Sequence, residues 1–201
     1  MRTAATLTCL CLAAGATVLG GCDECAHEET AFDRRVCRAE VERLALEEMT
    51  QAAVRRIGTG APVDTQFFPD NRSVQFDLQG CGRVNAADVV CVLTVTGLGF
   101  DWTLEVALQS WCTWPRRVSH AIDDMGNNYT PAEVRIADNP PSRSCLLQTL
   151  VAGVSQQMTV AFPNVHSHAE SLAQLSLEVE VDRGEGMTPG QVAFRNVAIE
   201  R

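Results

Sequence analysis

The chain contains no lysine, and arginine supplies all 16 of its basic residues. This bias indicates a coding preference more than a function. The arginines form no basic cluster, and 25 acidic residues leave a formal net charge of -9. Phosphate binding needs clustered positive charge, so the composition argues against a nucleic-acid-binding protein. We therefore expect no nucleic-acid partner.

The N-terminal apolar run is too short for a stable membrane span. It covers residues 4–20, follows the positive start Met1-Arg2, and is closed by the small residues Gly20 and Gly21. A positive start, an apolar run and small closing residues are the layout of a secretory signal peptide. The chain is therefore expected to act outside the cytoplasm.

The end of this run, Leu19-Gly20-Gly21-Cys22, resembles the lipobox of bacterial lipoproteins. The resemblance implies that the Cys22 thiol is acylated and that the chain is cleaved before Cys22. We expect a signal peptide over residues 1–21 and a mature protein anchored by lipid at the extracytoplasmic face of the bacterial cell membrane. A redox pair or half of a metal site at Cys22 and Cys25 is a weaker interpretation, because no βαβ context and no second ligand pair accompany it.

The cysteine count supports lipid attachment. Of the nine cysteines, cleavage removes Cys9 and Cys11, and lipid consumes Cys22. Six remain, an even number that can pair completely in an oxidising compartment. Cys81 and Cys91 flank the turn-rich stretch GRVNAAD, so a hairpin can bring them opposite each other. The predicted disulfides are Cys81–Cys91, Cys25–Cys37 and Cys112–Cys145.

Residues 23–57 contain neither proline nor glycine and are rich in Glu, Arg, Ala and Leu, which predicts a helix. A start near Thr30 lets Cys25 double back to Cys37, and Gly58 ends the helix. Apolar or small residues recur at about 3.5-residue spacing, with breaks at polar positions. We favour an amphipathic stalk or packing helix within a segment 22–60. A short coiled coil that forms a weak homodimer is the alternative.

Residues 61–201 alternate apolar and polar side chains in about eight short segments separated by Gly, Pro and Asn turns. Ser73 to Leu78 and Leu175 to Asp182 show the alternation most clearly. Such a pattern is typical of a β-sandwich or barrel, with one face of each strand in the core and the other in water.

Several motifs in this region occur in a familiar order: "GC…VVCVLTVT", "DDMGNNYTPAEVRI", "TLVAGV…VAF", "LAQLSLEV" and "VAFRNVAI". Over residues 72–200 the chain resembles a family of bacterial immunoglobulin-like extracytoplasmic domains of unknown function, related in fold to a small secreted mycobacterial immunoprotective antigen. The resemblance implies a mainly β fold, an Ig-like antiparallel β-sandwich preceded by an N-terminal α-helix. It supplies no catalytic residues. Cys112, Cys145 and the loop NPPSRSC depart from the family pattern.

Two groups of residues could bind a metal. Asp123, Asp124, Asn127 and Asn128 surround Gly126 and carry oxygen ligands suited to calcium, but the same residues favour a hairpin turn, which we prefer. His166 and His168 could hold a metal, but without a clear third ligand they indicate a solvated loop. We therefore predict no metal and no cofactor.

Two further groups could serve catalysis or binding. Ser119, His120 and Asp123 are triad residue types, but neighbours on one strand rarely form a triad. Trp102 is expected in the core by its alternation. Trp111 and Trp114 flank Cys112, and exposure there would indicate a binding surface.

These observations predict no catalytic residues and no enzyme activity. The expected function is a membrane-anchored, non-catalytic binding or scaffolding module of the cell envelope, with an envelope protein as partner. Two alternatives stay open: a metal-dependent or other envelope hydrolase, and a structural oligomer assembled through the N-terminal helix.

Overall fold

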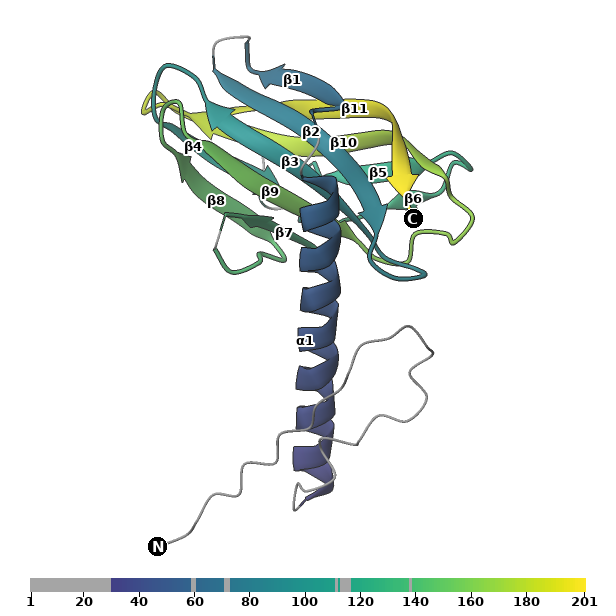
Figure 1. The fold of residues 1–201 in the computed structure, drawn as a ribbon. Helices are drawn as coiled ribbons and strands as arrows, with labels where there is room; N and C mark the ends of the chain where they lie inside the picture. Colours follow the sequence, from purple (N-terminus) through teal and green to yellow (C-terminus); the bar gives the residue numbers. More distant parts are fainter. Residues whose placement is uncertain (1–29, 59–60, 71–72, 111, 113–116, 138) are drawn as a thin grey trace, which may run out of the picture. The chain divides into compact units, whose positions relative to one another are not determined.

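A computed structural model describes residues 30–58, 61–70, 73–110, 112, 117–137 and 139–201. Within these ranges the chain forms one helix followed by eleven strands (Figure 1). The chain divides into two units, Met1–Arg43 and Leu44–Arg201, and the division falls inside the helix. The described elements are α1 (Ala31–Ile57), β1 (Asp64–Phe68), β2 (Val74–Arg83), β3 (Val89–Gly97), β4 (Trp102–Ala107), β5 (His120–Asp123), β6 (Asn128–Tyr129), β7 (Glu133–Ile136), β8 (Cys145–Leu150), β9 (Ser155–Phe162), β10 (Ser171–Asp182) and β11 (Thr188–Glu200).

The strands form two antiparallel layers that are joined along one side. One layer has the order β1-β2-β3-β9-β7, and the other is built on β10, which pairs with β11, β4 and β5. The last strand, β11, closes the join by pairing parallel to β2 through Ile199 and Cys81. The predicted fold class is confirmed: the chain is mainly β, an Ig-like antiparallel sandwich preceded by an N-terminal helix.

The core lies between the layers and follows the alternation of the sequence. On β2, Val74, Phe76 and Leu78 are fully buried while the residues between them are only partly covered. Phe162 and Phe194 add the largest buried side chains from β9 and β11. A fully buried apolar side chain contributes about 1.5–3 kcal/mol relative to an exposed one, so this alternation determines which face of each strand turns inward.

Strand β3 departs from this alternation, because both of its faces are buried from Val89 to Leu93. Val90 and Val92 point away from the core and form a second apolar cluster with Ala53 and Ile57 of α1. Here Ala53, Val54 and Ile57 at the end of the helix cover the face that would otherwise meet water. Period-2 reasoning placed this face in solvent, and it missed the cover because the cover comes from a distant segment.

Glycines on β2 make room for the helix end. A Cβ atom on Gly82 would lie 2.8 Å from Ile57 Cδ1, and one on Gly80 would lie 3.1 Å from Ile57 Cγ2. Farther back along the helix, an ion pair joins it to the sheet, with Arg135 Nη2 of β7 at 3.3 Å from Glu47 Oε1. The backbone of β2 thus approaches the helix more closely than any side chain would allow.

We predict that Ile57→Ala lowers the free energy of unfolding by about 2 kcal/mol or more, because Ile57 is only 4% exposed and its loss leaves a cavity. Leu44→Ala on the same helix is the matched control. Leu44 is 51% exposed, so its truncation should change stability by less than about 0.5 kcal/mol. Urea unfolding measures both, and equal costs would contradict the packing.

Candidate functional site

The outer face of the β10 layer carries three glutamates, Glu105, Glu178 and Glu180, here called the glutamate cluster. Glu105 of β4 lies directly opposite Glu180 of β10, and Glu178 follows on the same face two positions away. Glu178 and Glu180 are only 4% and 8% exposed. The alternation of LSLEVEVD predicted these glutamates in water, so their burial corrects the sequence analysis.

Two described residues just before β5, Arg117 and Ser119, contact Glu178. Strands β4 and β5 pair with the same edge of β10, and Ser119 N donates to Ala107 O at 3.0 Å, so the chain leaves this edge after Ala107 and returns at Ser119. Arg117, near the return, has Nη1 at 4.0 Å from Glu178 Oε2. Arg117 therefore lies beside the polar face of β10.

Glu178 is satisfied by several partners. Gln191 Nε2 donates to Glu178 Oε1 at 2.6 Å, and Glu178 N donates to Ser119 Oγ at 3.0 Å. Buried charges persist in proteins when they are paired and hydrogen-bonded in this way. Glu105 differs, because burial and then the negative charge of Glu180 raise its pKa above the ordinary value.

A disulfide borders the glutamate cluster. Cys112 and Cys145 are bonded with their Cα atoms 5.5 Å apart, and Cys81 and Cys91 are bonded across β2 and β3, as the sequence predicted. Cys37 is also disulfide-bonded. Its predicted partner Cys25 and the predicted lipid-attachment residue Cys22 lie outside the described residues.

The turn between β5 and β6 is organised by Asp123, which is buried. One carboxylate oxygen accepts hydrogen bonds from the N–H groups of Met125 and Asn127, and the other accepts from Asn127 Nδ2 and Tyr129 Oη. Gly126 supplies the positive φ of 86° that the turn needs. Protein donors occupy both oxygens of Asp123, which supports a structural turn and argues against calcium binding by this group.

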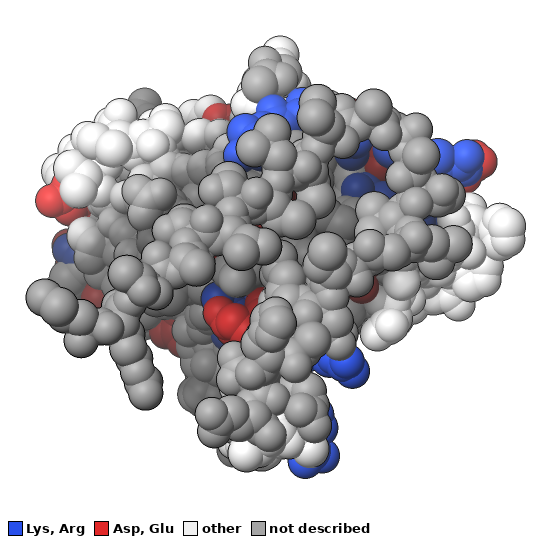
Figure 2. Space-filling view, turned by 60° about the horizontal axis from the view of Figure 1, so that its bottom comes forward, with Lys and Arg blue, Asp and Glu red and all other residues white. Residues whose placement is uncertain are grey.

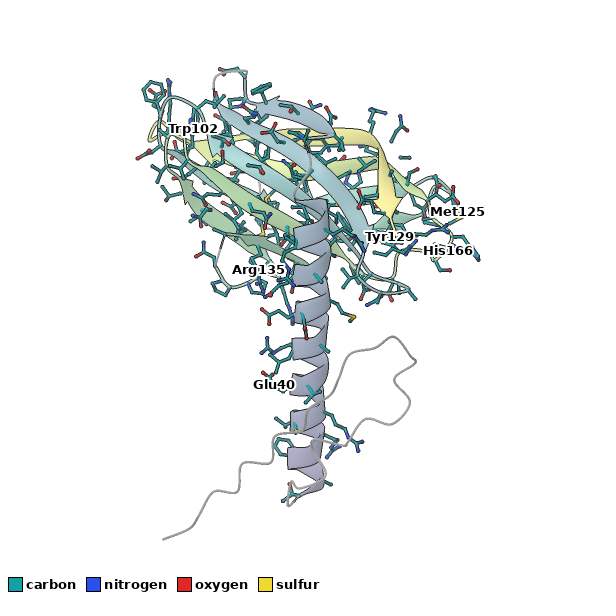
Figure 3. All side chains as sticks on the ribbon, in the orientation of Figure 1. Glu40, Trp102, Met125, Tyr129, Arg135 and His166 are labelled. Atoms are coloured by element: carbon teal, nitrogen blue, oxygen red, sulfur yellow. A yellow bond between two sulfur atoms is a disulfide. The ribbon has the colours of Figure 1, made fainter. Side chains whose placement is uncertain are left out.

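Tyr129 extends this network to the loop after β9. His166 N donates to Tyr129 Oη at 3.0 Å, and the two residues lie beside each other at one end of the sandwich (Figure 3). The guanidinium of Arg83 donates to the carbonyls of His166 at 2.6 Å and Ala169 at 3.0 Å. The loop is thus tied to β6 and to β2, which sequence reasoning did not predict.

The other candidate residues have separate roles. The imidazole rings of His166 and His168 lie 5.5 Å apart, exposed, and His166 Nδ1 accepts from His168 N. In the described residues they belong to no group of three metal-ligand side chains. Ser119 accepts from β10, His120 Nδ1 lies 3.3 Å from Val118 O, and Asp123 is engaged by its own turn, so the hydrogen bonds of these three residues do not link them as a triad.

The tryptophans are only partly described. Trp102 is 6% exposed and belongs to the core, as predicted. Trp111 and Trp114 lie outside the described residues.

In Figure 2 the arginine atoms of the described residues form several separate groups on the face shown. No helix in the described part of the chain has the length and hydropathy of a membrane span.

No protein-family model matches the chain, and no curated protein is significantly similar to it. Among solved structures, the GAE domain of yeast GGA1 is 10% identical over 64% of this chain and 95% of that chain, with a TM-score of 0.34. The GAE domain of GGA2p from Saccharomyces cerevisiae is 11% identical, covers 66% and 96%, and has a TM-score of 0.32. The collagen-binding subdomain ACE19 of the Enterococcus faecalis surface protein ACE is 8% identical, covers 58% and 90%, and has a TM-score of 0.26. These similarities are too weak to carry an argument about function.

The Asp123 turn generates a pH-dependent prediction. Burial by itself raises the pKa of Asp123, but the hydrogen bonds from Asn127, Tyr129 and Met125 outweigh it and lower the pKa below its ordinary value. The ionised carboxylate therefore stabilises the fold above the unfolded pKa of about 3.9, and this contribution is lost as the pH falls through the lower folded pKa. Asp123→Asn should destabilise the protein at pH 7, and its difference from wild type should shrink below about pH 4.

Tyr129→Phe is the companion variant. It removes a donor to Asp123 and an acceptor for His166 N, and should cost about 1–3 kcal/mol at pH 7. Because the two side chains share one network, the double variant should cost less than the sum of the single variants in urea unfolding. Additive costs would contradict the coupling.

Proposed function

We propose that this chain is a lipid-anchored extracytoplasmic protein of the bacterial envelope whose Ig-like domain is a non-catalytic binding or scaffolding module. The observation that carries the proposal is Leu19-Gly20-Gly21-Cys22 at the end of an apolar run. Lipid on Cys22 anchors the chain, and an envelope protein is the expected partner. Acyl chains contribute about 0.8 kcal/mol for each buried CH₂, so more than one chain gives stable attachment.

The disulfides support this location. Cys81–Cys91 and Cys112–Cys145 are formed, and Cys37 is disulfide-bonded as well. Structural disulfides persist in oxidising compartments such as the periplasm and the cell surface, and are rare in the cytosol. Because lipid modifies Cys22 in this proposal, an even number of cysteines remains in the mature chain, and all of them can pair in disulfides.

The use of the polar side chains supports a binding or scaffolding role. Asp123, Tyr129 and Arg83 are engaged in holding the domain's own turns and loops. Glu178 is engaged by Gln191 and by Arg117. These groups give rigid loops at the end of a sandwich, which is where Ig-like domains present binding surfaces.

We predict that Cys22→Ser moves the protein out of the membrane fraction or leaves an uncleaved precursor, because the acylated thiol is lost. Cys11→Ser is the matched control, since Cys11 lies in the expected signal peptide and should leave anchoring unchanged. Membrane fractionation with intact-mass measurement tests both. A Cys22→Ser protein that stays processed, acylated and membrane-bound like wild type would refute the anchor.

The second candidate function is an oligomer assembled through α1. Two apolar residues near its start, Phe32 and Val36, are 67% and 53% exposed and share one helical stripe. Exposed apolar side chains at this spacing favour association with the same helix of a second copy.

We predict concentration-dependent dimers of the mature chain in sedimentation equilibrium, weakened by the double variant Phe32→Ser/Val36→Ser. Val63→Ser removes an equally exposed apolar residue outside the helix and should leave association unchanged. A mature chain that is monomeric at every concentration would exclude this candidate without affecting the lipid anchor.

A further inference from the structure

Three potential metal-ligand side chains meet on the outer face of the β10 layer: Glu105, Cys112 and Cys145. One carboxylate oxygen and the two Sγ atoms all lie within 4.8 Å of one another, and each residue is half-buried. Among the described residues, this is the one group of three His, Cys, Asp or Glu side chains whose potential ligand atoms lie this close together. We call these residues the sulfur–carboxylate cluster.

The strand register fixes Glu105 and Cys145 independently of the bond between the sulfurs. Cys145 pairs with Ala107 in the register of β4 and β8, two positions from Glu105 on the same face. Leu108 N donates to Ser144 O at 2.9 Å, and Cys112 N donates to Gln109 O at 3.0 Å. Cys112 Sγ lies 3.2 Å from Ser144 O, next to β8, so the thiol formed when the disulfide opens can donate to this carbonyl and stay beside Cys145.

The two described disulfides differ in their access to a reductant. Cys81 and Cys91 are fully buried in the core, whereas Cys112 and Cys145 are half-buried at the surface. Thiol–disulfide exchange requires that an attacking thiolate reach one of the sulfurs. A soluble dithiol is therefore expected to open Cys112–Cys145 first.

Reduction changes what the cluster can bind. A disulfide sulfur is not a thiolate ligand, so the oxidised cluster offers one carboxylate. A dithiol reduces Cys112–Cys145 with two electrons and two protons and is itself oxidised to a disulfide, leaving two thiols. A divalent cation then displaces two protons and binds two thiolates and the Glu105 carboxylate. Thiolates with a carboxylate suit zinc and other thiophilic cations, with water in the remaining position.

We propose that the sulfur–carboxylate cluster is a redox-gated site for a thiophilic divalent cation of the zinc class, closed when Cys112–Cys145 is oxidised and open when it is reduced. The neighbouring Glu180, opposite Glu105 in the strand register, adds negative charge beside the bound cation. The proposal does not depend on the lipid anchor at Cys22.

Cobalt and zinc titrations of the full mature chain test the site. The protein is reduced with dithiothreitol, freed of the reductant without oxygen, and checked by alkylation and mass for free Cys112 and Cys145. Co²⁺ should then produce thiolate-to-cobalt absorption at one equivalent, and Zn²⁺ should displace it. The oxidised protein should give no such absorption.

Variants assign the ligands. Cys112→Ser and Cys145→Ser should each abolish the absorption. Glu105→Gln should weaken binding about tenfold or more, since loss of an outer-shell partner alone costs about 10–100-fold. Glu185→Gln removes an exposed charge outside the cluster and should leave the affinity unchanged.

The following results would overturn the proposal. Absence of charge-transfer absorption in the reduced protein, or its persistence in Cys112→Ser, excludes these ligands. A reduced chain that loses its β-sheet circular dichroism also overturns it, because the site requires the folded sheet. The double variant Cys112→Ala/Cys145→Ala shows whether the sandwich folds without this disulfide, so that loss of binding is assigned to the ligands.

Discussion

Strand β10 constrains one half of the sandwich, because it is hydrogen-bonded along both edges and covered on both faces. β11 follows one edge over most of its length, and β4 and β5 share the other. A strand covered on both faces cannot carry acidic residues unless they are paired. Gln191 and Arg117 meet that requirement at the Glu178 carboxylate.

The other layer solves the same problem with a helix. The outward side chains of β3 are apolar, and the end of α1 covers them with Ala53 and Ile57. The cover needs a close approach, which β2 permits by having no side chain at Gly80 and Gly82. An exposed sheet face would carry polar residues at positions 90 and 92, so the apolar Val90 and Val92 depend on the cover that α1 supplies.

Local pattern was sufficient to predict about eight of the eleven strands, the helix and the pairing of Cys81 with Cys91, because these depend on periodicity and on short separations in sequence. The strands β1, β6 and β8 were not predicted, because they are short or lack a clear alternation of buried and exposed residues. The preference for a turn at Asp123 was likewise local and is supported by its hydrogen bonds. What the sequence could not show depends on distant segments. The cover over Glu178, and the approach of Arg83 to the loop after β9, arise only when strands far apart in the chain become neighbours.

The contact between Ile57 and Gly82 has a consequence for how related sequences can diverge. A side chain at position 82 would occupy the space that Ile57 Cδ1 now fills, so neither position can enlarge unless the other shrinks. In homologues the two positions should therefore covary in size, a larger residue at 82 being accompanied by alanine or valine at 57. Such covariation would reveal, from sequences alone, that the helix packs against the sheet at this point.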